Sequence, residues 1–153
     1  MTTPITFDNA TPRFALPLLY AGQAQKEVFV NEGIAITDAL LHCVVEGIAS
    51  NPPATPVEGT AWIVAASPAG DWSGKGGFLA CRQAGQWLFF SPLPGMRVFN
   101  RATGQDHRRV GSNWIAASAP AVPAGGTTID VEARAALANV LQCLRDAGTL
   151  PPA

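Results

Sequence analysis

The apolar positions between residues 22 and 45 predict a helix that is unusually rich in hydrophobic side chains. At about 100° per residue, apolar side chains surround most of its circumference: Val28, Phe29, Val30, Ile34, Ile36, Leu40, Leu41, Cys43 and Val44. The polar stripe that is left is narrow and consists of Glu27, Asn31, Asp38 and His42. A helix that covers a small domain usually has one apolar face and a broad polar one. We therefore expect burial on two sides of this helix and interpret the polar stripe as its solvated face.

The pattern changes after residue 60 to short apolar segments separated by turn residues. The segments are "AWIVAA", "GFLACR", "QWLFFS", "MRVFN", "DHRRV" and "NWIAA", and glycine or proline occurs in most of the breaks. Short, regularly spaced strands of this kind indicate an antiparallel meander. A sheet this small is marginal by itself, so we expect the long N-terminal helix to pack on it.

The two ends of the chain differ from this central part. Residues 1–21 contain Pro4, Pro12 and Pro17 without a helical period, which predicts an extended arm that becomes ordered on assembly. Residues 117–127 form a linker of proline, alanine and glycine. A C-terminal helix is predicted for 128–150, with Asp130 as N-cap and Gly148 at its end. Its apolar positions step by 4, 3 and 4 residues, and one further leucine widens this seam: Ala133, Leu137, Val140, Leu144 and, beside them, Leu141.

The predicted fold class is therefore α+β, with the N-terminal helix on an antiparallel meander and a C-terminal helix after the linker. We expect one domain over residues 22–116, flanked by the arm, the linker and an oligomerisation helix. A helix of about 17 residues on a tether is marginally stable alone, which favours bundling with copies of itself.

Composition narrows the range of functions. The net charge is −1 and 14% of the residues are charged, so there is no basic field for nucleic acid or an anionic membrane. No apolar run approaches the length of a membrane span, and the N-terminus lacks the pattern of a signal peptide, which predicts synthesis in the cytoplasm. Cys43, Cys81 and Cys143 are too far apart for a CxxC metal site and are odd in number, so we expect buried, reduced thiols.

Catalytic chemistry is not indicated. His107 lies in "QDHRRVG" without a nucleophile motif beside it, and "GKGG" lacks the spacing of a phosphate-binding loop. We predict no enzyme activity, no catalytic residue, no metal and no cofactor. Trp72 differs from the other tryptophans because it lies in the polar, glycine-rich stretch "AGDWSGKGG". It is either a plug over the sheet edge or a contact for a glycan or partner protein, together with Lys75, Arg97 and Arg108.

The stretch "LPLLYAGQAQKEVFVNE" resembles a family of unknown-function proteins encoded in proteobacterial prophages and gene transfer agents. The resemblance continues through "PPATPVEGTAWIVA" and "GDWSGKGGFLACRQAGQWLFFSPLPGMRVFNRATGQDHRRVGSNW", over about residues 13–115. It implies a virion part of the head-spike or tail-fibre type, which helps particles adhere to recipient cells. Longer relatives carry receptor-binding segments after this module, so a chain ending at residue 153 is expected to be a base or connector. The family supplies no catalytic residue.

These observations together predict a homo-oligomeric virion protein. A trimer is favoured, and a pentamer is the alternative for a protein on a fivefold capsid vertex; the other partners are virion proteins of the vertex or fibre. The predicted interface consists of Phe29, Ile36, Leu40, Leu137, Val140, Leu141 and Leu144. The alternative function is a small carbohydrate-binding module for capsular polysaccharide, which requires an exposed Trp72.

Overall fold

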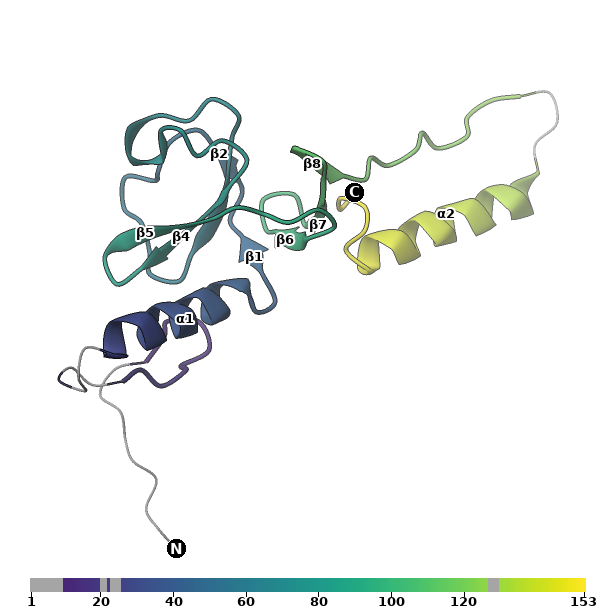
Figure 1. The fold of residues 1–153 in the computed structure, drawn as a ribbon. Coiled ribbons are helices and arrows are strands. Elements are labelled where there is room, and N and C mark those ends of the chain that lie inside the picture. The colour runs from purple at the N-terminus through teal and green to yellow at the C-terminus, as the bar shows by residue number, and fades with distance from the viewer. Residues whose placement is uncertain (1–9, 20–21, 23–25, 127–129) are drawn as a thin grey trace, which may run out of the picture. The chain divides into compact units, whose positions relative to one another are not determined.

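A computed structural model describes residues 10–19, 22, 26–126 and 130–153 of the chain. Within these residues the protein is α+β, with two α-helices and two mixed four-stranded sheets (Figure 1). The chain forms two compact units. The first unit comprises Met1–Cys43 and Ile48–Ser91, and the second comprises Val44–Gly47 and Pro92–Ala153. The boundary after Ser91 lies inside the range 22–116 that was predicted as one domain.

The first unit contains helix α1 (Lys26–Leu40) and one sheet. The sheet has the order β2 (Ile48–Ala49), β3 (Ala61–Val64), β4 (Leu79–Gln83) and β5 (Gln86–Phe90). Strands β2 and β3 are parallel, whereas β3, β4 and β5 pair antiparallel. The long β3–β4 connection includes a short 3₁₀ helix, Gly70–Trp72. The centre of the core is formed by Val64, Trp72 and Ala80.

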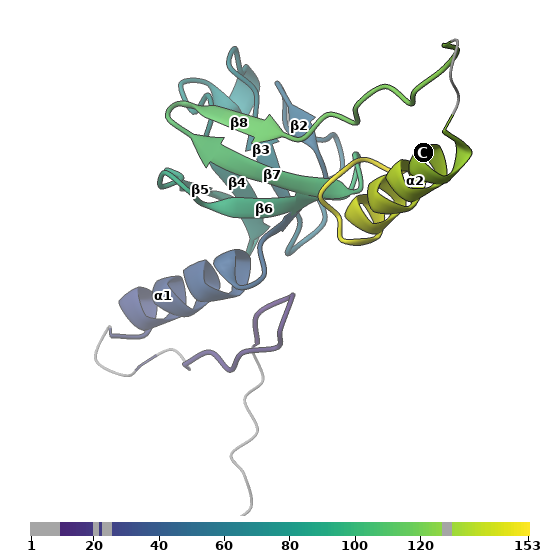
Figure 2. The ribbon, with the colours of Figure 1, turned by 90° about the vertical axis from the view of Figure 1, so that its right-hand side faces the viewer.

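The second unit contains the other sheet and helix α2 (Val131–Asp146) (Figure 2). The sheet has the order β1 (Val44–Val45), β6 (Arg97–Asn100), β7 (Gln105–Val110) and β8 (Asn113–Ala116). Strand β1 runs parallel to β6, and the other pairs are antiparallel. After α2, the C-terminal tail returns to the sheet, where the Asp106 N–H donates to the Gly148 carbonyl oxygen at 2.7 Å.

The prediction of a single antiparallel meander was wrong, although all six predicted strands exist. They are divided between two sheets, and each sheet adds one short parallel strand from residues 44–49. The N-terminal helix was expected to continue to Val45 but ends at Leu40. His42 has a positive φ of 46°, which stops the helix and turns the chain into strand β1.

Both predicted ends of the C-terminal helix are confirmed. The Asp130 side chain accepts a hydrogen bond from the Ala133 N–H at 2.8 Å, as an N-cap does. At the other end Gly148 has a φ of +68°; its N–H donates to the Arg145 carbonyl, and the Thr149 N–H donates to the Leu144 carbonyl. These are the two bonds of a Schellman motif. No helix of the described residues is long and apolar enough to cross a membrane.

Candidate functional site

The polar stripe of α1 binds the N-terminal arm. Asp38 is completely buried, and its carboxylate accepts hydrogen bonds from the Thr11 hydroxyl at 2.7 Å, the Phe14 N–H at 2.8 Å and the Arg13 N–H at 3.2 Å. A buried carboxylate is stable only when such donors replace water. Asp38 therefore fixes the turn at residues 11–14 against the helix.

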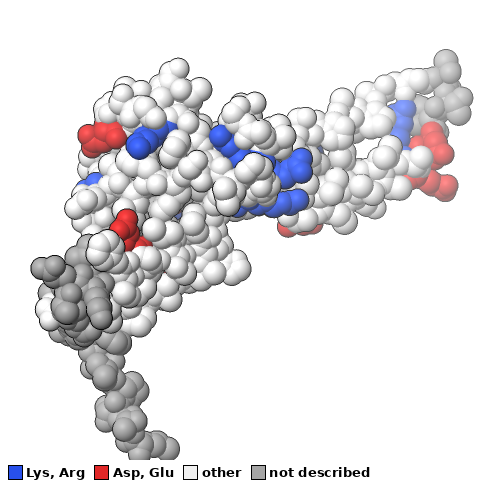
Figure 3. All heavy atoms as spheres, in the orientation of Figure 1, with Lys and Arg blue, Asp and Glu red and all other residues white. Residues whose placement is uncertain are grey.

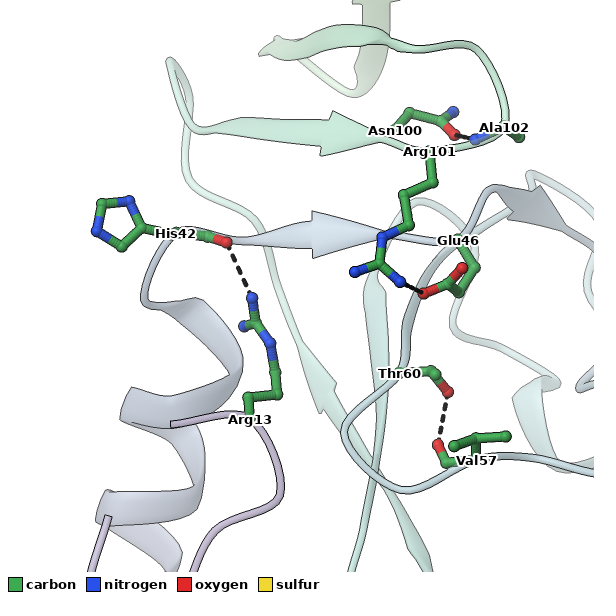
Figure 4. A network of polar contacts seen from close by, with 8 residues as sticks. All are labelled: Arg13, His42, Glu46, Val57, Thr60, Asn100, Arg101 and Ala102. Atoms are coloured by element: carbon green, nitrogen blue, oxygen red, sulfur yellow. Dashed lines mark hydrogen bonds and ion pairs between the residues drawn. The ribbon is translucent and has the colours of Figure 1, made fainter. Parts of the chain in front are cut away.

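Arg13 supplies the cap for the C-terminus of α1. Its guanidinium donates to the carbonyl oxygens of Asp38 and Ala39 at 2.8 Å, and to that of His42 at 2.9 Å (Figure 4). The last carbonyls of a helix have no partner within the helix and attract positive charge. Arg13 supplies both hydrogen-bond donors and a positive charge at this end, so the arm and the end of α1 stabilise each other.

The interpretation of this stripe as a solvated face was wrong. Asn31 also binds the arm, because its side-chain amide forms two hydrogen bonds with the backbone of Leu19. It accepts from the Leu19 N–H at 2.7 Å and donates to the Leu19 carbonyl at 3.0 Å. Of the stripe, His42 is exposed, and the Glu27 side chain lies outside the described residues. Between residues 10 and 19, the arm predicted to order on assembly is thus held by its own chain.

Trp72 is completely buried, with 0% of its surface exposed. Its ring packs edge-on against Trp87, with 5.1 Å between ring centroids and an interplanar angle of 85°, and lies 6.5 Å from the ring of Trp62. An indole enclosed in this way has no face left for a sugar. Of the two interpretations of Trp72, the plug agrees with its position and the glycan contact does not.

The four residues predicted as contacts do not form one site. Trp72 and Lys75 belong to the first unit, where the Lys75 ammonium lies over the rings of Phe78 and Phe89 at 5.5 and 5.4 Å. Arg97 and Arg108 belong to the second unit and are direct cross-strand neighbours on β6 and β7. Lys75 covers the aromatic core as a cation–π partner, whereas the two arginines share an exposed face.

A small pocket of about 230 Å³ opens beside this arginine pair. Its walls include Arg97, Asp106, Arg108, Ile115 and Thr149. In the charge distribution of Figure 3, blue Lys and Arg atoms gather over β6 and β7. The sequence predicted Arg97 and Arg108 only as two separate cations. Exposed and buried residues alternate along β6 and β7, and this alternation places both arginines on the exposed face.

The predicted interface residues divide between exposed and buried positions. On α1, Phe29 is 78% exposed, whereas Ile36 and Leu40 are half-buried. On α2, Leu137, Val140 and Leu144 are 50%, 55% and 38% exposed. Leu141 is the one buried residue of α2. Leu141 is therefore not an available contact for another subunit.

Buried ionisable groups do not offer a reactive centre. Burial raises the pKa of the Cys43 thiol to about 11 and that of Cys81 to about 12, against a smaller opposing effect of Arg13, so both stay protonated at neutral pH. Both thiols are buried as predicted, whereas Cys143 is exposed. No group of three potential metal ligands occurs in the part of the chain that the structure describes.

His107 lies within the core of the second unit in a polar cluster. Asn100 Oδ1 accepts from the Ala102 N–H at 3.0 Å (Figure 4), which directs Asn100 Nδ2 toward His107 Nε2 at 3.2 Å. An amide nitrogen can only donate, so Nε2 is the acceptor and the imidazole is neutral. Burial lowers the pKa of His107, and the nearby Asp106 opposes this effect. The cluster fixes the β6–β7 turn.

Comparison with known proteins identifies a family. Residues 30–115 match the family described as "Protein of unknown function (DUF2793)". Neither a curated protein nor a solved structure matches the chain. The matched range covers α1 from Val30 onward, strands β1 to β7 and β8 as far as Ile115, and it is more than half of the sequence. The chain is therefore a member of this family.

Proposed function

We propose that the protein is a structural component of a phage-like particle, a head-spike or fibre base that assembles as a homo-oligomer and helps the particle attach to recipient cells. The observation that carries this proposal is the exposed apolar seam of α2. Leu137, Val140 and Leu144 lie on one side of a helix whose two ends are fully capped. A helix of 16 residues with one buried side chain gains little from its own unit.

The order of side chains in the seam favours more than two copies. Leu137 and Leu144 occupy one core position of the heptad, and the β-branched Val140 occupies the other. Leucine at the first position with a β-branched residue at the second shifts coiled coils toward three or four strands. This supports the trimer over a dimer. The resemblance to prophage and gene-transfer-agent proteins supports the setting in a virion, where symmetric appendages are common.

The carbohydrate-binding alternative has lost its proposed contact, because Trp72 is buried. No other exposed tryptophan replaces it among the described residues, since Trp62, Trp87 and Trp114 are all half-buried. We therefore retain the structural role alone.

Light scattering of the purified chain tests the proposal. We expect a mass that is a multiple of 15.9 kDa, with three copies favoured. Val140→Asp places a charge in the seam and should reduce the mass to that of one chain. Ala135→Asp introduces the same residue on the opposite side of α2 and should leave the mass unchanged. A folded wild-type chain that remains a monomer at high micromolar concentration would contradict the proposal.

A further inference from the structure

Two arginines stand side by side on the exposed face of the second unit's sheet. Arg97 on β6 is paired in register with Arg108 on β7, and the neighbours Val98 and His107 point to the buried side. Like charges directly opposite each other destabilise an antiparallel pair. The stability of the sheet therefore gives no reason for this arrangement.

The charge of the pair is only partly compensated. Asp106 Oδ2 is 3.8 Å from Arg97 Nη1, which is a long ion pair between exposed side chains. Outside the backbone pairing of β7 with its neighbours, the Arg108 side chain has no hydrogen bond or ion pair with any other residue that the structure describes. Arg101, on the same β6–β7 hairpin, is different, because its guanidinium bonds Glu46 at 2.8 Å (Figure 4). A surplus positive charge thus remains at Arg97 and Arg108.

The surroundings of the pair determine which anion fits. Ile115 on β8 lies directly opposite Arg108 and is 49% exposed, and with Ala116 and Ala117 it gives the pocket an aliphatic wall. The described lining contains no aromatic ring on which a sugar could stack. Strand β8 is last in the strand order and has β7 as its only partner among the described strands. An edge strand of this kind can accept a further extended segment.

We propose that this surface binds an acidic, extended segment of a partner protein, which lies along β8 and places one carboxylate between Arg97 and Arg108. The carboxylate accepts charge-assisted hydrogen bonds from the guanidinium groups, and the aliphatic part of its side chain rests on Ile115. An added strand lies two strand spacings from β7, about 9.6 Å, and three from β6, about 14.4 Å. An arginine and a glutamate bridge the first distance easily, and Arg97 reaches the same carboxylate only when both side chains are extended across β8. This proposal rests on the proposed connector function, because it gives the chemistry of a partner that the connector would bind. Peptide binding can be measured whatever the oligomeric state of the protein.

A labelled peptide provides the test. The probe is a peptide of about ten residues in which glutamate alternates with threonine, so that all carboxylates lie on one face of the extended chain. Binding to the full-length protein is followed by fluorescence anisotropy at low and at high salt. We expect binding that weakens with salt, that is lost when glutamine replaces glutamate, and that protects the amides of β8 from hydrogen exchange. Arg97→Gln and Arg108→Gln should each weaken it by roughly tenfold or more.

Arg101→Gln is the matched control, because it removes the same charge from the same hairpin but outside the pocket; it should bind the peptide like the wild type. Equal binding by Arg108→Gln and the wild type would overturn the proposal. It would also be overturned if polygalacturonate or inorganic phosphate bound in an Arg108-dependent way while the peptide did not. Light scattering tests a third outcome. If Arg108→Gln lost self-association, the surface would be an interface with a second copy of this chain, and the proposal would be overturned.

Discussion

The two helices show opposite relations to the units that contain them. Helix α1 is held by the arm, which bonds its polar stripe through Asp38 and Asn31 and caps its last turn through Arg13. Helix α2 has capping hydrogen bonds at both ends, but Leu141 is its only buried residue. The first helix therefore has partners in its own chain along its side and at its C-terminal end, whereas the second has them mainly at its two ends.

Because of this difference, we expect the contacts of α1 to contribute to folding and the exposed side chains of α2 to contribute to assembly. The amino acids that hold α1 are polar and belong to the same chain, so the first unit needs no other copy for that helix. The side chains that would stabilise α2 are apolar and exposed. Apolar side chains gain about 1.5–3 kcal/mol each on full burial, and we expect α2 to obtain this gain from a partner. The comparison predicts that changes in α1 act on folding and changes in the seam of α2 act on association.

The largest effect is expected for Asp38→Ala. This change leaves the buried Thr11 hydroxyl and the partly buried N–H groups of Arg13 and Phe14 without their acceptor, and a buried donor without a partner costs about 1–3 kcal/mol. We expect the free energy of unfolding to fall by about 3–5 kcal/mol in urea denaturation.

Glu32→Ala is the control for this change, because Glu32 is exposed on the same helix; it should alter stability by less than about 0.5 kcal/mol. Limited proteolysis adds a second measurement, since Asp38→Ala should expose residues 10–19 to cleavage. If both variants unfold alike, the arm does not stabilise α1, and the contrast between the two helices fails.

A smaller effect distinguishes the two sides of α2. Leu141→Ala removes a buried side chain and should lower the free energy of unfolding by about 2–3 kcal/mol at every protein concentration. Leu137→Ala changes an exposed position, so its effect should be close to zero in dilute solution and should grow as the protein concentration rises. Denaturation curves at several concentrations measure both. A Leu137→Ala effect that does not depend on concentration would show that the seam is not used in association.

Local signals in the sequence were sufficient for the elements themselves. The six strands between residues 61 and 116 follow from their short apolar segments and from the turn residues between them, and the caps at Asp130 and Gly148 follow from residue type. Each of these features is decided by side chains a few residues apart. The pairing of β1 and β2 was not predictable in this way, because each has two residues and pairs with a strand distant in sequence.

The burial of Trp72 was left open and the arm contacts were missed, for the same physical reason. Trp72 lies in a polar stretch, but the ends of its loop are fixed by bonds from the Ala69 N–H to the Ser50 carbonyl and from the Gly77 N–H to the Val64 carbonyl, both 2.9 Å. These bonds fold the indole inward. A Cβ at Gly76 would approach the Ala66 carbonyl oxygen to 2.8 Å, so this glycine is required by a tight loop, although the sequence alone did not distinguish it from the other glycines around it. Asp38 likewise meets its donors 24–27 residues away.

The smallest expected effect compares the buried polar groups of the two units. Asp38 in the first unit is surrounded by donors, whereas His107 in the second must remain neutral, because Nε2 accepts from Asn100 and burial lowers its pKa below the ordinary 6.5. As the pH falls below 6.5, the unfolded chain binds this proton before the folded one, so the stability of the folded state decreases. Urea denaturation between pH 7 and about 5 should show this decrease in the wild type and a smaller one in His107→Gln. Stability that rises toward pH 5 in the wild type but not in His107→Gln would mean that the folded protein stabilises the protonated imidazole, and the second unit would then resemble the first in carrying a partnered charge.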